Sequence, residues 1–332
     1  MTEPLHPSTL GEILDRTFQI YRAKFLLFIG IAALPTLVML GVHLADITWL
    51  HLGSLVHPFR QPGIALWSFF VSLGFYHVSS FLHLLILPAL VYLTSNLSLG
   101  EGGSIQKAIR FAAAGWRRYL WIAILKLSAI LVIPEILAAG LIAGAAFAGD
   151  RAGVFNGNRS EFFAVLMAAS AIIAGGALFL WLGSCFSLAV PACALEGIAG
   201  YRAMRRSWVL TKGSRLRILF TFLTIAIFSW FLMYGLQLVC RWIYILLFRM
   251  HFFGTTAQHL YPEAIYLMYA MVAAMVGAIY PIAITLFYYD QRIRLEGYDI
   301  ERMMEAAGLN APGITLSVES PIAPGEPQEG QA

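Results

Sequence analysis

The stretch FLLFIGIAALPTLVMLGVHLA, residues 25–45, runs without a charged residue from just after Lys24 to just before Asp46. A helix needs about 20 mostly apolar residues to cross the hydrocarbon core of a bilayer, so this stretch predicts one membrane span. Outward along the chain, five further runs have the same character: 61–100, 119–149, 162–195, 218–240 and 264–289. Only Lys126 and Glu135 bring a charge into these runs. The sequence therefore predicts six spanning helices.

The overall composition points to the same class. The chain has 332 residues, of which 59% are hydrophobic and 12% are charged, whereas a typical soluble domain is about 45–50% apolar and about 25% charged. A soluble protein of this size has too little interior to bury so much apolar surface. The composition excludes an ordinary soluble enzyme or nucleic-acid binder, and it predicts an all-α polytopic membrane protein.

The formal net charge of +4 is unevenly distributed along the chain. If the N-terminus lies inside, four segments are on the inner side: the one before span one, those between spans two and three and between spans four and five, and the one after span six. These four segments carry 16 of the 22 Lys and Arg residues. The outer loops carry four of them. Because cytoplasmic loops of membrane proteins are enriched in Lys and Arg, both termini are predicted to face the cytoplasm.

The segments before spans one, three and five repeat at a spacing of 95 residues, with Thr9, Ser104 and Ala199 as equivalent positions. Each segment has charged residues on one helical face and apolar residues on the other, which is typical of a helix at a membrane interface. We expect three helical-hairpin repeats, each with an interfacial amphipathic helix, a span out and a span back. The units cover about 8–100, 101–197 and 198–297 of a membrane domain at 1–305. A Pro- and Glu-rich tail, 306–332, is expected to be disordered and cytoplasmic.

Three short motifs accompany this organisation: LGEILDRTFQIYR at 10–22, LEG at 195–197 with RSWVLTKG at 206–213, and FYYDQRIRLEGYDIE at 287–301. In this order, over about residues 8–303, the chain resembles the bacterial family called the glycerophosphoryl diester phosphodiesterase membrane domain. The resemblance implies a protein of the bacterial inner membrane that corresponds to the membrane region of that family. The catalytic domain of fused members is expected to carry a His-Arg-Gly motif, which this sequence lacks. Phosphodiesterase activity is therefore not expected here.

Charged residues on the predicted interfacial helices and at the inner span ends are the first candidates for a site. Arginine and lysine at the inner face bind lipid phosphates or acidic partners, and the candidates of this kind are Lys107, Arg110, Arg202, Arg205, Arg206 and Lys212. Glu196 and Asp290 end spans four and six beside such residues. They have two interpretations: ion pairs that fix span ends to the interfacial helices, or parts of a polar cluster whose arginines bind headgroup phosphate.

Lys126 and Glu135 are the second candidates, because an ionisable side chain inside a span is costly and suggests function. They are nine residues apart, so they point to roughly opposite helix faces and are not expected to pair. One interpretation is a polar pathway or a substrate contact. In the other, Lys126 extends towards the inner surface, and Glu135 caps a kink after Pro134.

The leading functional interpretation is a non-catalytic membrane protein that binds lipids, including anionic lipids, or that acts as a scaffold for another membrane protein. No nucleic-acid partner, metal or cofactor is expected. The alternative is a transporter or permease with a central polar cavity. A water-filled cavity at Lys126 or Glu135 favours transport, whereas a dry bundle with basic grooves at the inner face favours lipid or partner binding.

Overall fold

The computed structural model describes residues 7–45, 62–151, 160–249 and 256–306, and its regular secondary structure there is helical. The first group of helices is α1 (Leu10–Ala23), α2 (Phe25–Ala45) and α3 (Pro62–Ser98). The second group is α4 (Ile105–Ala114), α5 (Trp116–Leu127), a π-helical turn (Ser128–Val132), α6 (Ile133–Arg151), α7 (Ser160–Cys185) and α8 (Ala189–Leu195). The third group is α9 (Tyr201–Leu210), α10 (Arg215–Arg249), α11 (Thr256–Val276) and α12 (Ile279–Glu296), and α13 (Tyr298–Ala306) follows it.

Six stretches of these helices are long and apolar enough to cross a membrane, namely 25–44, 73–98, 116–144, 166–195, 215–246 and 264–296. By helix length and composition, the prediction of six spanning helices in an all-α, multi-pass membrane protein is thereby confirmed. Each of the three groups begins with a short helix. The predicted outer loops fall largely at 46–61, 152–159 and 250–255, and the predicted tail falls almost entirely at 307–332, so these predictions lie outside the described residues.

Local sequence explains where several helices begin and end. At the start of α1, the Glu12 backbone N–H donates to Thr9 Oγ1, and the Glu12 carboxylate accepts from the Thr9 backbone N–H at 2.7 Å. This reciprocal capping box satisfies two backbone donors that the helix itself leaves unpaired. At the end of α12, Gly297 takes a left-handed conformation with φ 64° and ψ 36°, which glycine adopts at little steric cost.

Prolines mark the interruptions in spans four and six. Helix α8 begins at Ala189 and α12 begins at Ile279, so Pro191 and Pro281 are each the third residue of a new helix. In the first turn a backbone N–H has no partner within the helix, and the missing N–H of proline therefore costs little there. Pro88 differs from both, since it lies inside α3, which continues through it.

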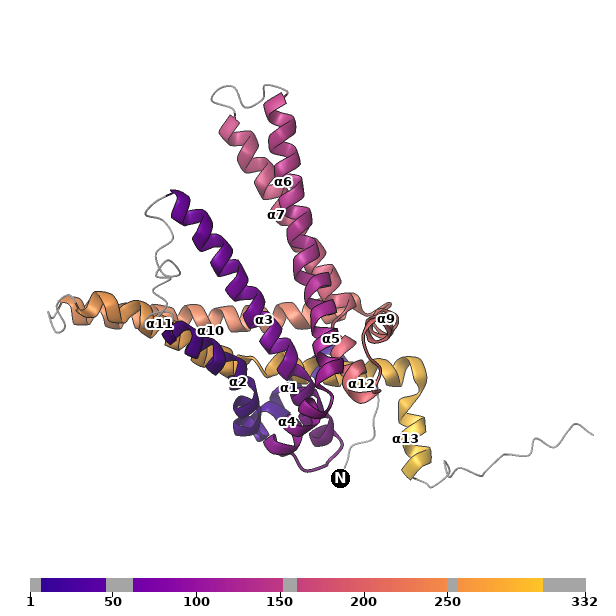
Figure 1. Cartoon of the computed structure of the whole chain (residues 1–332). Helices are drawn as coiled ribbons and strands as arrows, with labels where there is room; N and C mark the ends of the chain where they lie inside the picture. Colours follow the sequence, from indigo (N-terminus) through magenta and orange to yellow (C-terminus); the bar gives the residue numbers. More distant parts are fainter. Residues whose placement is uncertain (1–6, 46–61, 152–159, 250–255, 307–332) are drawn as a thin grey trace, which may run out of the picture.

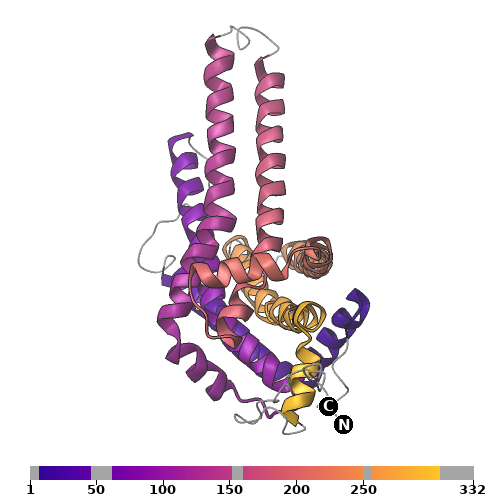
Figure 2. The ribbon, with the colours of Figure 1, turned by 90° about the vertical axis from the view of Figure 1, so that its right-hand side faces the viewer.

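The long helices diverge from a common base where the short helices gather (Figures 1 and 2). In one arm α6 and α7 pack along each other, and in another α10 packs along α11, which also contacts α2. Helix α12 lies at the base and packs against α1, α3 and α10. The segments of all three groups thus meet around α12.

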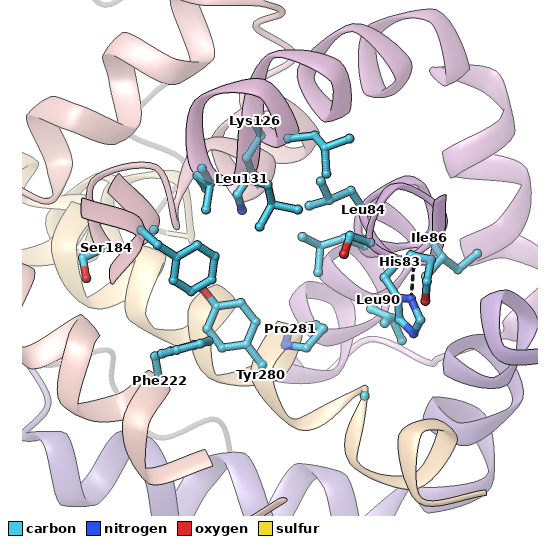
Figure 3. A pocket seen from close by; sticks show the side chains of 18 of the residues that line it. His83, Leu84, Ile86, Leu90, Lys126, Leu131, Ser184, Phe222, Tyr280 and Pro281 are labelled. Carbon is cyan, nitrogen blue, oxygen red and sulfur yellow. Dashed lines mark hydrogen bonds between the residues drawn. The ribbon is translucent and has the colours of Figure 1, made fainter. Parts of the chain in front are cut away.

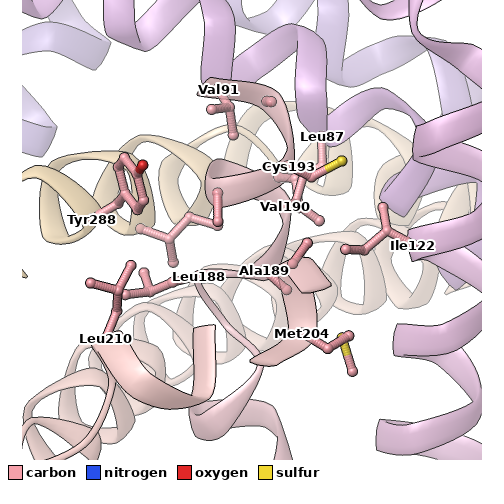
Figure 4. Packing of buried hydrophobic residues seen from close by; sticks show 14 of the residues in the cluster. Leu87, Val91, Ile122, Leu188, Ala189, Val190, Cys193, Met204, Leu210 and Tyr288 are labelled. Carbon is pink, nitrogen blue, oxygen red and sulfur yellow. The ribbon is translucent and has the colours of Figure 1, made fainter. Parts of the chain in front are cut away.

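The base contains the apolar core of the protein. Residues 189–194 of α8 are all buried, and so are the residues of α12 from 281 to 291. Figure 4 shows the packing around α8, where Leu188 and Val190 lie among Leu87 of α3, Ile122 of α5 and Tyr288 of α12. This core fixes the helices that surround the candidate site.

Candidate functional site

A cavity of about 420 Å³ lies between the spans (Figure 3). Its walls come from α2, α3, α5, the π-helical turn, α7, α10 and α12. They are mostly apolar, with Leu84, Leu87, Leu90, Leu131, Phe179 and Phe222 among them. Ligand pockets in proteins are typically about 300–1,000 Å³ and mainly apolar, with a few polar groups. The polar side chains in this wall are Tyr76, Ser79, Ser80, His83, Lys126, Ser184 and Tyr280.

Lys126 is the charged residue of this wall. It lies in the last turn of α5, directly before the π-helical turn, and only 6% of its surface is exposed. Figure 3 shows its side chain directed into the cavity. Within the described part of the chain, its ammonium group makes no hydrogen bond and no ion pair. The structure therefore places Lys126 in a cavity.

The other polar groups of the wall differ in how they are bonded. Nδ1 of His83 lies 2.8 Å from the Ser79 carbonyl oxygen, and because a carbonyl only accepts, Nδ1 must donate, which leaves Nε2 for another partner. The Ser184 hydroxyl donates to the Leu180 carbonyl oxygen at 2.8 Å. The Tyr280 hydroxyl has no hydrogen-bond partner among the described residues, and it enters the cavity opposite Lys126 (Figure 3).

Glu135 does not line this cavity and does not meet Lys126. Its Oε2 lies 3.0 Å from Nε2 of His77, whose Nδ1 donates to the Leu73 carbonyl oxygen at 2.7 Å. This pair links α3 to α6. The sequence alone did not predict it, because His77 and Glu135 belong to different spans and their relative register is set only by helix packing.

Glu196 lies in a network with Arg206 at the base of the molecule. Nε of Arg206 donates to both oxygens of Glu196, at 2.9 and 3.0 Å, and its Nη1 lies 2.5 Å from Glu296. The Tyr288 hydroxyl donates to Glu196 at 2.6 Å. The hydrogen bond to Glu296 is the main cause that raises the pKa of Arg206, with Glu196 acting in the same direction. The network joins α9 to α12.

Asp290 lies in a second network, which joins the N-terminal segment to α10 and α12. Its carboxylate is buried and accepts from the Ser8 backbone N–H at 2.8 Å, from Nε of Arg294 at 3.0 Å and from Nη1 of Arg217 at 3.3 Å. Both arginines also donate to the Ser8 carbonyl oxygen, at 2.7 and 2.8 Å. Sequence reasoning missed Arg217 as a partner, since it lies 73 positions from Asp290.

The structure separates the six basic candidates into two kinds. Arg206 is engaged in the ion pairs described above. The other five are exposed at the base and have no ion pair among the described residues: Lys107, Arg110, Arg202, Arg205 and Lys212. Arg206 is therefore a structural cation, and the other five remain accessible to phosphates or to a partner.

Arg205 and Arg206 provide a matched test of this separation. Arg206→Met leaves Glu196 and Glu296 close together without their shared cation, and we expect it to lower the free energy of unfolding by about 1–3 kcal/mol. Arg205→Met removes the same charge from an exposed site and should change stability by less than about 0.5 kcal/mol. Thermal unfolding in detergent measures both variants. Equal effects would show that the network at Glu196 does not stabilise the fold.

Within the described residues, no group of three or more His, Cys, Asp or Glu side chains could hold a metal ion. Comparison of the chain with protein-family models, with curated proteins and with solved structures finds no match. The class of protein consequently rests on the fold and on the site. They define a multi-pass α-helical membrane protein with a largely apolar cavity between its spans.

Proposed function

We propose that this chain is a non-catalytic multi-pass protein of the bacterial inner membrane that binds a lipid or lipid-like amphiphile in the cavity between its spans. The observation that carries the proposal is the cavity of about 420 Å³, whose wall is predominantly apolar and contains few polar groups. Apolar walls favour an alkyl chain, since each buried methylene contributes about 0.8 kcal/mol. The exposed basic residues at the base would add contacts to anionic headgroups.

We also propose that both termini face the cytoplasm and that the chain contains three related hairpin units. The geometry supports a common side for the N-terminal segment and the end of α12, because Ser8 bonds directly to Asp290. The basic helices α4 and α9 lie at the same base (Figure 1), which fits an inner face enriched in Lys and Arg. Membership of the glycerophosphoryl diester phosphodiesterase membrane domain family remains part of this proposal, carried by the three sequence motifs.

Filling the cavity tests the proposed function. Gly183 lines the cavity, and a Cβ atom built on it meets no atom within 4 Å, so Gly183→Leu places a bulky side chain into open space. We expect this variant to copurify with several-fold less lipid than the wild type, as measured by mass spectrometry of the purified protein in detergent. The cause is the loss of space for the alkyl chain, not a loss of folding.

Gly176 supplies the control, because it lies on the same helix, is exposed and also has no atom within 4 Å of a built Cβ. Gly176→Leu should retain the wild-type amount of lipid. If Gly183→Leu also retains it, with both variants folded, the cavity is not the lipid site and the proposed function is wrong.

A transporter of the same amphiphile is the second candidate. It is favoured by the position of the cavity, which is bounded by helices of all three groups and contains Lys126. The apolar wall argues against a polar solute as the cargo. Transfer of a fluorescent lipid between the leaflets of vesicles that contain the purified protein tests this candidate, since a binding protein without transport activity leaves the transfer rate at that of empty vesicles.

A further inference from the structure

We propose that the ligand of this cavity is an amphiphile with one anionic group, a carboxylate or a phosphate, and that Lys126 and the Tyr280 hydroxyl are the two groups that bind it. This inference rests on the proposed function and adds to it the charge and the acceptor chemistry of the ligand. It assigns a binding role to two side chains whose polar groups have no partner among the described residues.

The burial of Lys126 is the first step. An ammonium group that is removed from water without a counter-ion is costly, and only 6% of the surface of Lys126 is exposed. A lysine at the end of a span often extends its side chain to the aqueous surface, but here the side chain enters the cavity (Figure 3). A bound anion would offset the cost of this placement.

The absence of a protein counter-ion in the wall is the second step. No Asp or Glu is among the residues that line the cavity in the described part of the chain. Glu135, the acidic residue nearest in sequence on the same span, is paired with His77 of α3. The described wall thus supplies no counter-charge for Lys126, and an anionic group on the ligand would supply it.

The direction of the hydrogen bonds is the third step. An ammonium group only donates, and a tyrosine hydroxyl is able to donate. Lys126 on α5 and Tyr280 on α12 face the same space from opposite walls (Figure 3). A ligand group that contacts both must accept from Lys126, and the oxygens of a carboxylate or a phosphate are able to accept from Lys126 and from the Tyr280 hydroxyl together. The apolar wall that surrounds them fits the alkyl chain of the same molecule.

The binding of three single-chain probes tests the inference on the full-length protein in detergent: hexadecanoate, hexadecyl phosphate and uncharged hexadecanol. We expect the wild type to bind both anions at least about tenfold more tightly than hexadecanol, because hydrogen bonds between charged groups are stronger than those between a charged and a neutral group. Lys126→Met should lose this preference and still bind hexadecanol. Lys126→Arg should restore it, and Tyr280→Phe should weaken anion binding about 2–10-fold.

Lys24→Met is the matched control, because it removes the same charge from an exposed position directly after α1 and should leave the preference unchanged. A wild type that binds hexadecanol as tightly as the anions, or a Lys126→Met variant that retains the preference, would overturn the inference and leave the proposed function standing. A wild type that binds none of the three probes would instead contradict the proposed function. Melting curves of every variant show whether it has folded.

The same chemistry occurs in membrane phospholipids and in free single-chain amphiphiles. Reconstitution into bilayers of phosphatidylcholine with phosphatidylglycerol, followed by mass spectrometry of the retained lipid, distinguishes these sources. Enrichment of phosphatidylglycerol that is lost in Lys126→Met identifies a phospholipid as the ligand. Displacement of the hexadecanoate probe without such enrichment identifies a free amphiphile. If a folded wild type shows neither the enrichment nor the displacement, the result counts against an anionic ligand.

Discussion

Asp290→Asn is expected to lower the free energy of unfolding by about 3–5 kcal/mol, because it removes a buried carboxylate from two arginines. In the wild type this carboxylate lies between Arg217 and Arg294 and accepts from the Ser8 backbone N–H. Asparagine has nearly the same shape, but it offers one acceptor oxygen, and its amide donors face the guanidinium groups. The two arginines are then left close to each other without a counter-charge.

Thermal unfolding in detergent measures this effect, and we expect a fall in melting temperature on the order of 10 °C. Asp15→Asn is the control, since Asp15 is exposed on α1 and, among the residues that the structure describes, accepts only from Gln19, at 2.7 Å. It should melt within about 2 °C of the wild type. A melting temperature of Asp290→Asn within that same range would mean that the carboxylate does not stabilise the base.

A second readout follows from the position of Ser8. Its backbone is held by Asp290 through the N–H and by both arginines through the carbonyl oxygen. If the carboxylate is lost, the segment that precedes α1 loses its contact with α12. We expect limited proteolysis to cleave Asp290→Asn near its N-terminus faster than the wild type at a temperature where both are folded.

The six spans were predictable from the sequence, because span length and apolar composition are local properties that survive without knowledge of packing. The start of α1 was similarly accessible, since Thr9 and Glu12 form a capping box within four residues. The interruptions at Pro191 and Pro281 were harder. A proline inside an apolar run fits either a kinked continuous helix or the start of a new one, and the structure places each of these two in the first turn of a new helix, where its missing donor costs little.

The candidate site was predictable only in part, because its contacts join distant segments. The cost of burying a charge pointed to Lys126 as a functional residue, but the choice between a cavity and the lipid interface depends on how α5 packs against α3 and α12. Arg205 and Arg206 were grouped together, and they differ because Glu296, 90 positions further along, reaches only one of them. The exposed Tyr76 and the half-buried Tyr280 likewise gave no local sign that both line one cavity.

Gly200→Ala is expected to have the second large effect and to lower the free energy of unfolding by about 2–4 kcal/mol. Gly200 precedes α9 with φ 59° and ψ −134°, a region that residues with a Cβ atom rarely enter. A Cβ atom there would also lie 2.8 Å from Cδ1 of Trp121 on α5. The substitution therefore adds backbone strain and a steric clash at the junction between α5 and α9.

Gly213→Ala separates these two causes. Gly213 has φ 89°, and a Cβ atom placed there meets no atom within 4 Å. Gly213→Ala therefore measures backbone strain alone, and we expect it to lower the free energy of unfolding by about 1–2 kcal/mol. The double variant Gly200→Ala with Trp121→Leu should recover the part of the loss that is due to the clash and not the part due to strain. Thermal unfolding of the single and double variants gives this interaction energy. If Trp121→Leu recovers nothing, the full effect of Gly200→Ala lies in the backbone, and the close approach of Trp121 does not constrain the residue at position 200.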